Sequence, residues 1–123
     1  MNETGGGAAG AENVFVGIDS GGGDWAGASN YNVGVGSYTL LGAMNGAQFN
    51  TGIGQSALRR ITTGGYNVGI GYAAGDNITT GNNNVVIGYN SGGTMTTQDE
   101  MVLIGIQAGD AINDDAADGT VAI

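Results

Sequence analysis

The chain has 123 residues, a length typical of one domain, and holds 27 Gly but no Pro, Cys or His. Eleven acidic residues against two basic ones give a net charge of −9, which excludes nucleic acid as a partner because two arginines cannot follow a phosphate backbone. The lack of His and Cys argues against an enzyme and against a bound metal or cofactor, and no apolar run is long enough to make a membrane a partner.

Residues 1–12, MNETGGGAAGAE, precede the repeats described below and consist largely of Gly and Ala. Such a segment is either a flexible tail or an arm that becomes ordered on a partner. We expect an N-terminal docking arm, because small residues permit close approach to another protein's backbone. The residues expected to dock are Met1, Asn2, Glu3, Thr4 and, in a loop further along the chain, Trp25.

Residues 13–123 form a repeat domain whose unit reads Asn-x-x-(Val/Ile)-Gly. The copies begin at residues 13, 32, 50, 67, 84, 101 and 120, so the steps are 19, 18, 17, 17, 17 and 19 residues. Near-equal steps with longer ones toward the ends are typical of a solenoid. Gly in an α-helix costs about 1 kcal/mol per residue, which disfavours helix. The sequence therefore predicts an all-β fold, a parallel β-roll or β-helix of about seven coils.

The fourth position of the unit is β-branched and apolar in every copy. It shares one strand face with the second position, because side chains alternate along a strand. We expect this fourth position to form the core ladder: Val16, Val35, Ile53, Ile70, Ile87, Ile104 and Ile123. The third position is Gly in three central coils, and we expect this opposite face to meet a neighbouring chain.

The first position of the unit predicts a ladder of asparagine side chains that bond along the solenoid axis or cap turns, at Asn13, Asn32, Asn50, Asn67 and Asn84. Aromatic residues stand directly before three of these, at Tyr31, Phe49 and Tyr66, and Tyr72 and Tyr89 predict a shorter stack. We interpret both sets as structural rather than as ligand-binding.

A second apolar line lies 11 residues after the start of four coils, at Ile61, Ile78, Met95 and Ile112. Pairs of Thr follow it in three coils, which predicts a second short strand in each. Arg59 and Arg60 form the one basic cluster, for which we expect an acidic partner across a subunit contact.

Both ends of the repeat domain carry less regular residues. Trp25, in the loop of the first coil, is either a contact anchor or a cap of the core. The last strand, at TVAI, leaves a sheet edge that other chains, a loop or another molecule would cover. Acidic residues gather late in the chain, and we expect a solvated acidic tip rather than a metal site, at Asp99, Glu100, Asp110, Asp114, Asp115 and Asp118.

The stretch NVGIGYAAGDNITTGNNNVVIGYNSG resembles the NTAIGYxAGxxxTTGxxNTxIGYxAG repeats of phage virion fibres and spikes. It is similar, more distantly, to the head repeats of trimeric autotransporter adhesins. The resemblance covers residues 13–123 and is most specific over 50–109. It implies a parallel β-roll or β-helix that assembles as a homotrimer around a threefold axis.

The resemblance and the arm together lead us to expect a structural protein on the surface of a virion. It would be a trimeric capsid decoration (cement) protein whose arm docks on the major capsid protein or another virion protein. One alternative is a segment of a phage tail fibre, spike or surface adhesin that binds a host surface. Another is the subunit of an extracellular filament that grows by end-to-end stacking of coils.

Overall fold

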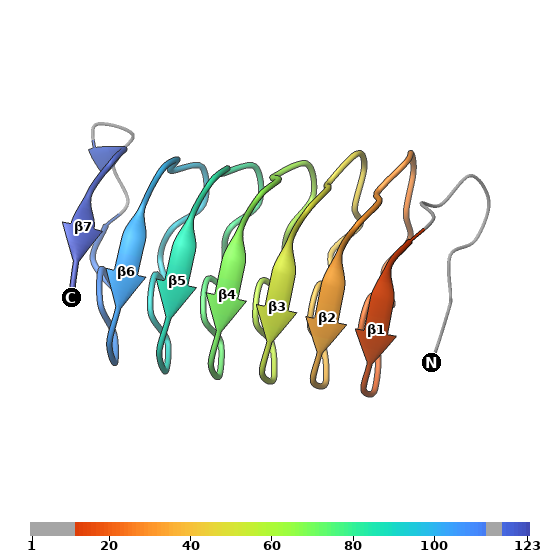
Figure 1. The fold of residues 1–123 in the computed structure, drawn as a ribbon, viewed down its shortest axis with the longest axis horizontal. Coiled ribbons are helices and arrows are strands. Elements are labelled where there is room, and N and C mark those ends of the chain that lie inside the picture. Colours follow the sequence, from red (N-terminus) through yellow and green to blue (C-terminus); the bar gives the residue numbers. More distant parts are fainter. Residues whose placement is uncertain (1–11, 113–116) are drawn as a thin grey trace.

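Short parallel strands, one in each coil, form one side of a solenoid whose first and last strands lie at opposite ends (Figure 1). The computed structural model describes residues 12–112 and 117–123. Within them the strands pair in chain order, so the predicted all-β parallel solenoid is confirmed, with about six turns. The strands are β1 (Val14–Val16), β2 (Val33–Val35), β3 (Thr51–Ile53), β4 (Val68–Ile70), β5 (Val85–Ile87), β6 (Val102–Ile104) and β7 (Val121–Ala122).

The register between strands follows the sequence repeat. Val14 pairs with Val33 at one end of the sheet, and Val102 pairs with Val121 at the other. Each pair joins equivalent positions of the Asn-x-x-(Val/Ile)-Gly unit. The predicted starts of the coils are therefore confirmed, including the longer steps at both ends.

The prediction of a second short strand in each coil is wrong, because turns and bends occupy that part of the described chain. Left-handed residues break up the backbone after each strand: in the coil of β3, Gly54, Ser56 and Leu58 all have positive φ. The segment with the threonine pairs still bonds the next coil, since the Thr62 N–H donates to the Thr79 carbonyl at 2.9 Å. The backbone is thus paired along the axis without the extended segment that a strand needs.

The core contains the third position of each unit, and the prediction of a fourth-position core ladder is wrong. Phe15, Val86 and Leu103 point inward and are buried. The fourth-position side chains lie on the outer face: Ile53 is 40% exposed and Ile123 is 91% exposed. This correction applies to all seven residues: Val16, Val35, Ile53, Ile70, Ile87, Ile104 and Ile123. Three of them, Ile70, Ile87 and Ile104, are half-buried on the outer face.

Side-chain size explains how glycine can occupy an inward position. Leu58, in the turn after β3, fills the core so completely that a Cβ on Gly69 would lie 2.7 Å from its Cγ. Where the strand supplies a large residue, the turn supplies glycine instead: a Cβ on Gly21 would lie 2.6 Å from Cδ2 of Phe15. Gly69 therefore leaves room for a leucine from the turn, while a Cβ on Gly34 would meet Phe15 and one on Gly52 would meet Ala57. The central glycines on the strands face inward and are not an outer contact surface.

The second apolar line lies in the interior of the solenoid. Ile61, Ile78 and Met95 are fully buried, and Ile112 packs against the same cluster while partly exposed. Together with the inward strand residues they make one continuous core along the solenoid. This arrangement leaves the opposite side of every strand to face outward.

The glycine that ends each unit lets the coils stack closely, which a pair of substitutions can test. Gly88 and Gly105 both have φ +129°. A Cβ added to Gly88 would lie 2.3 Å from the carbonyl oxygen of Gly105, whereas a Cβ added to Gly105 would meet only the Ala108 Cβ, at 4.0 Å. We expect Gly105→Ala to lose about 1–3 kcal/mol of unfolding free energy through backbone strain alone. Gly88→Ala should lose clearly more in urea titrations, because the next coil must also move; equal losses would contradict close stacking.

Candidate functional site: an exposed apolar sheet face

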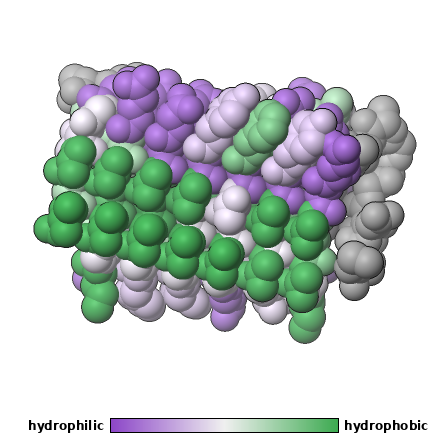
Figure 2. All heavy atoms as spheres, in the orientation of Figure 1, coloured by the Kyte–Doolittle hydropathy of each residue, from purple (hydrophilic) through white to green (hydrophobic). Residues whose placement is uncertain are grey.

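The outer side of the sheet carries two ranks of side chains, which we call the sheet face. One rank is the fourth position of each unit, whose residues are named above. The other is the second position: Val14, Val33, Thr51, Val68, Val85, Val102 and Val121. Figure 2 shows both ranks as rows of hydrophobic side chains that cross the strands.

The geometry of the sheet face follows from the strands that carry it. Neighbouring strands lie about 4.8 Å apart, so six steps make the face about 29 Å long. Alternate residues on one strand lie about 6.8 Å apart, which separates the two ranks. β-Branched residues favour this extended backbone, and neither rank contains a charged residue.

A third, mixed row borders the sheet face just beyond the glycine of each unit. It includes Ile18 and Ile106, which are strongly exposed, and the half-exposed Tyr72 and Tyr89. The two tyrosine rings stack with centroids 5.3 Å apart and planes 12° apart, as predicted. Apolar surface therefore extends past the strands in part of the molecule.

An exposed apolar surface of this extent in a folded protein is typical of an interface. It has no array of donors and acceptors to orient a substrate, and its chemistry is the burial of aliphatic groups away from water. The rest of the chain carries a net charge of −9, so an uncharged face is also where copies of the chain repel each other least. The arrangement thus favours docking over catalysis.

The predicted asparagine ladder is present and runs inside the coils beside the start of each strand. Asn67 Nδ2 donates to Asn50 Oδ1 at 3.0 Å and to the Gly81 carbonyl at 2.8 Å. Its Oδ1 accepts from both the backbone N and the Nδ2 of Asn84, at 3.1 and 2.9 Å. The ladder ends where the Met101 N–H donates to Asn84 Oδ1. Four of its members are fully buried: Asn32, Asn50, Asn67 and Asn84.

The asparagine ladder therefore supports the coils and is not a ligand site. Each asparagine side-chain oxygen accepts from the backbone N–H at the start of the next coil, where it takes the place of a backbone carbonyl. The buried N–H groups therefore keep a hydrogen-bond partner. Asn13 begins the series, half-buried, with its Oδ1 accepting from the Asn32 N–H at 2.8 Å.

A second polar ladder lies two residues before the start of the last coils, and sequence reasoning missed it. The Gly65 N–H donates to Asn82 Oδ1, the Asn82 N–H to Asp99 Oδ1, and the Asp99 N–H to Asp118 Oδ1. The signal was available, because Asn82, Asp99 and Asp118 align in the repeat. Two carboxylates of the expected acidic tip thus bind backbone N–H groups.

Another member of the acidic tip bonds a side chain of the preceding coil. Asp110 accepts a hydrogen bond from Asn90 Nδ2 at 3.1 Å, while Asp114 and Asp115 lie outside the described residues. Among residues 12–112 and 117–123, no three His, Cys, Asp or Glu side chains are grouped so that they could hold a metal ion.

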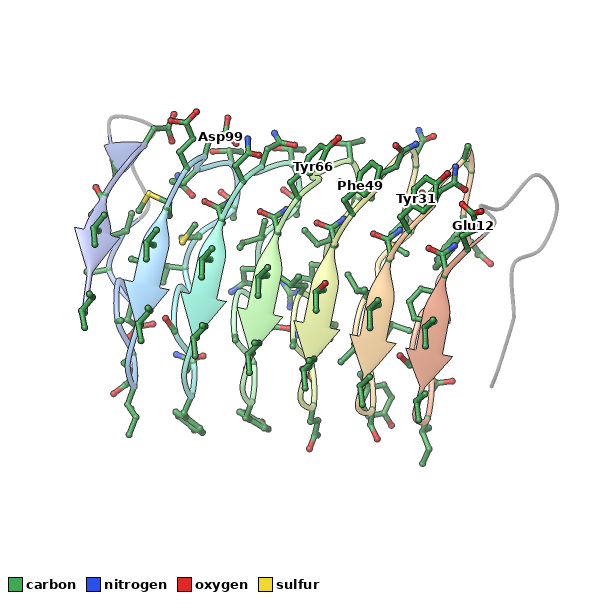
Figure 3. The ribbon with its side chains drawn as sticks, in the orientation of Figure 1. Glu12, Tyr31, Phe49, Tyr66 and Asp99 are labelled. Atoms are coloured by element: carbon green, nitrogen blue, oxygen red, sulfur yellow. The ribbon has the colours of Figure 1, made fainter. Side chains whose placement is uncertain are left out.

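The predicted aromatic ladder crosses three coils at the edge of the sheet face (Figure 3). The rings of Tyr31 and Phe49, and those of Phe49 and Tyr66, stack with centroids 4.8 Å apart. Glu12 stands at the N-terminal end, where its hydrogen bond and its negative charge raise the pKa of Tyr31. The rings cover each other's faces and expose their edges, so they do not offer a flat platform to a ligand.

Two other predicted contact residues have partners within the chain. Trp25 is half-buried and packs edge-on against Phe15, with ring centroids 5.3 Å apart, so it contacts the core as a cap would. Arg59 makes an ion pair with Asp76 of the next coil, with Nε 2.7 Å from Oδ1 and Nη2 2.9 Å from Oδ2. The expectation of a cross-subunit partner is therefore wrong for Arg59.

The docking arm cannot be placed in the same way, because Met1, Asn2, Glu3 and Thr4 lie outside the described residues. The part of the chain that the structure describes contains no helix with the length and apolar character needed to cross a membrane. Comparison with protein-family models, curated proteins and solved structures gives no match to this chain. The sheet face is thus the main evidence for what the chain does.

A substitution in the asparagine ladder tests its structural role. Asn67→Ala removes the acceptor of two Asn84 donors and the donor to Gly81, at about 1–3 kcal/mol for each buried group left without a partner. We expect a loss of at least about 3 kcal/mol in unfolding free energy, measured by denaturant titration. The control is Asn30→Ala, whose half-buried side chain bonds no described residue; its change should stay within about 0.5 kcal/mol.

Proposed function

We propose that the chain is a homotrimeric structural protein of a phage virion that assembles through the sheet face. The observation that carries this proposal is that two uncharged ranks of β-branched side chains lie on the outer side of the parallel sheet, exposed toward its ends and half-buried along its middle. A solenoid of this size buries a small share of its own surface, so it gains stability from a partner that covers such a face.

Copies of the chain itself are the partner that best fits the charge distribution. The whole chain is strongly acidic, yet the sheet face holds only Val, Ile and one Thr. Closed cyclic assemblies are the common solution for like chains, because every apolar face is then covered at once. The resemblance to repeats of trimeric virion proteins supports three copies, now with the second and fourth positions turned toward the neighbours instead of the third.

Within the virion, we propose the role of a capsid decoration protein whose N-terminal arm docks on the major capsid protein or another shell protein. A trimer presents three arms from one rigid body, and the avidity of three weak contacts far exceeds that of one. The Gly and Ala content of residues 1–12 suits close approach to a partner's backbone.

A segment of a tail fibre, spike or surface adhesin is the second candidate. The in-register pairing from β1 to β7 favours it, because coils of this kind can be added to build a longer shaft. The two candidates share the trimeric solenoid and differ in what the ends bind. The number of copies on a particle would separate them, since decoration proteins cover a lattice and fibres attach at few places.

The assembly predicts a specific effect for a charge placed on the sheet face. Ile70→Asp, at the centre of the fourth-position rank, puts an unpaired carboxylate in the trimer interface while leaving the core of each chain intact. We expect a folded monomer at micromolar concentration, with the circular dichroism of the native protein, in sedimentation velocity experiments.

The matched control adds the same charge elsewhere. Thr63 is exposed in the turn that precedes β4, and the Thr63→Asp variant should remain a trimer. A native protein that sediments as a monomer would overturn the proposed assembly. An Ile70→Asp variant that stays trimeric would show that the sheet face is not the interface.

The decoration role predicts that the arm is needed for attachment and not for folding. Deletion of residues 1–12 should leave a folded trimer of nearly equal melting temperature that no longer co-sediments with undecorated capsids. Full-length protein provides the control in the same gradient. Equal binding of both would contradict docking through the arm, and Trp25→Ala would then test the loop of the first coil.

A further inference from the structure

We propose that Thr51 sets the axial register of the trimer, an inference that rests on the proposed assembly through the sheet face. The residue lies in β3, in the second-position rank, where the other six members are all valine. Its hydroxyl is the one polar group in the two ranks. The role assigned to it is to keep the coils of the subunits at the same height.

The repetition of the sheet face leaves the axial position of one subunit relative to the next poorly specified. Because both ranks repeat at every coil, a shift of one subunit by about 4.8 Å brings aliphatic side chains against aliphatic side chains again. Such a shift loses the contacts of a single coil at one end. Flat and repetitive strands specify register weakly for this reason. The change from Val35 to Ile53 in the fourth rank alters shape but not polarity.

Thr51 breaks this repetition because its hydroxyl needs a partner. The backbone N–H of Thr51 donates to the Asn67 carbonyl at 2.8 Å, but its Oγ1 bonds no described residue. The side chain is half-buried in the single chain, so water can still reach it. Docking of another subunit would remove that water, and a buried hydroxyl without a partner is unfavourable.

The aligned register gives this hydroxyl a partner. With all third coils at one height, polar groups from the neighbouring subunits lie level with it: their Thr51 hydroxyls and the exposed amides of Gln55. A shift of one coil places it level with the valines of β2 or β4 instead. One polar residue in an apolar seam specifies register in the same way in coiled coils, at a cost in stability.

Symmetry provides a direct readout of register. In a closed trimer the shifts between subunits must sum to zero, so any trimer with a shifted subunit is asymmetric. An aligned trimer gives one amide NMR signal for each labelled residue, whereas a shifted one gives several. Valine-labelled protein is suitable, because valine occurs in every strand except β3.

The test compares Thr51→Val with the native protein and with two controls. We expect the native trimer and Thr51→Ser, which keeps the hydroxyl, to give one signal per labelled residue that both share. Thr51→Val should remain trimeric but show additional signals from shifted assemblies. The double variant Thr51→Val/Val68→Thr moves the hydroxyl by one coil and should restore a single set.

The outcomes separate the two proposals. A Thr51→Val trimer with a single set of signals would overturn the register role and leave the assembly in place. A loss of symmetry in the double variant as well would also overturn it, because the hydroxyl would then not be the cause. A native protein that is a monomer would overturn the assembly and the register role together.

Discussion

Every coil is held by hydrogen bonds to the coil before it, so the environment of a residue depends on residues 17 to 19 positions away. This constraint explains the two features that recur in the first five copies of the unit. A Cβ on the terminal glycine would collide with the next coil, as at Gly88, and loss of the first asparagine would leave buried N–H groups without an acceptor. Once the coils stack in this way, the strands can only be parallel, in register and exposed on one side.

The repeat in the sequence predicts the features that depend only on equivalent residues of successive coils lying side by side. The coil starts, the asparagine ladder and the aromatic stacks needed only the alignment of equal positions, and all are found where they were predicted. The line at Ile61 and Ile78 is periodic in the same way, and both of its side chains are buried. These features are periodic along the chain, so a single sequence is enough to predict them.

The side of the strand that faces inward could not be read from apolar character alone. Both sides of the strand are uncharged, and in the three coils with glycine at the third position the larger side chains are on the outer side. Which side is buried depends on the opposite wall of the coil, where Leu58 takes the volume that Gly69 gives up. That compensation between strand and turn is visible in the sequence only when the two positions are compared coil by coil. The prediction of a second strand failed because the threonine pairs lie in bends, although the backbone N–H groups of two of these pairs still bond the next coil.

The ion pair between Arg59 and Asp76 has a consequence for digestion by proteases. A protease of the trypsin type needs a basic side chain in its specificity pocket, and the sequence offers only Arg59 and Arg60. Both lie in one turn, where Arg59 is held by a carboxylate of the adjacent coil and Arg60 is exposed. Cleavage at Arg59 therefore requires its ion pair to open before the enzyme can bind it. Digestion by that class of enzyme should start at Arg60, the one basic side chain that is exposed in the folded coil.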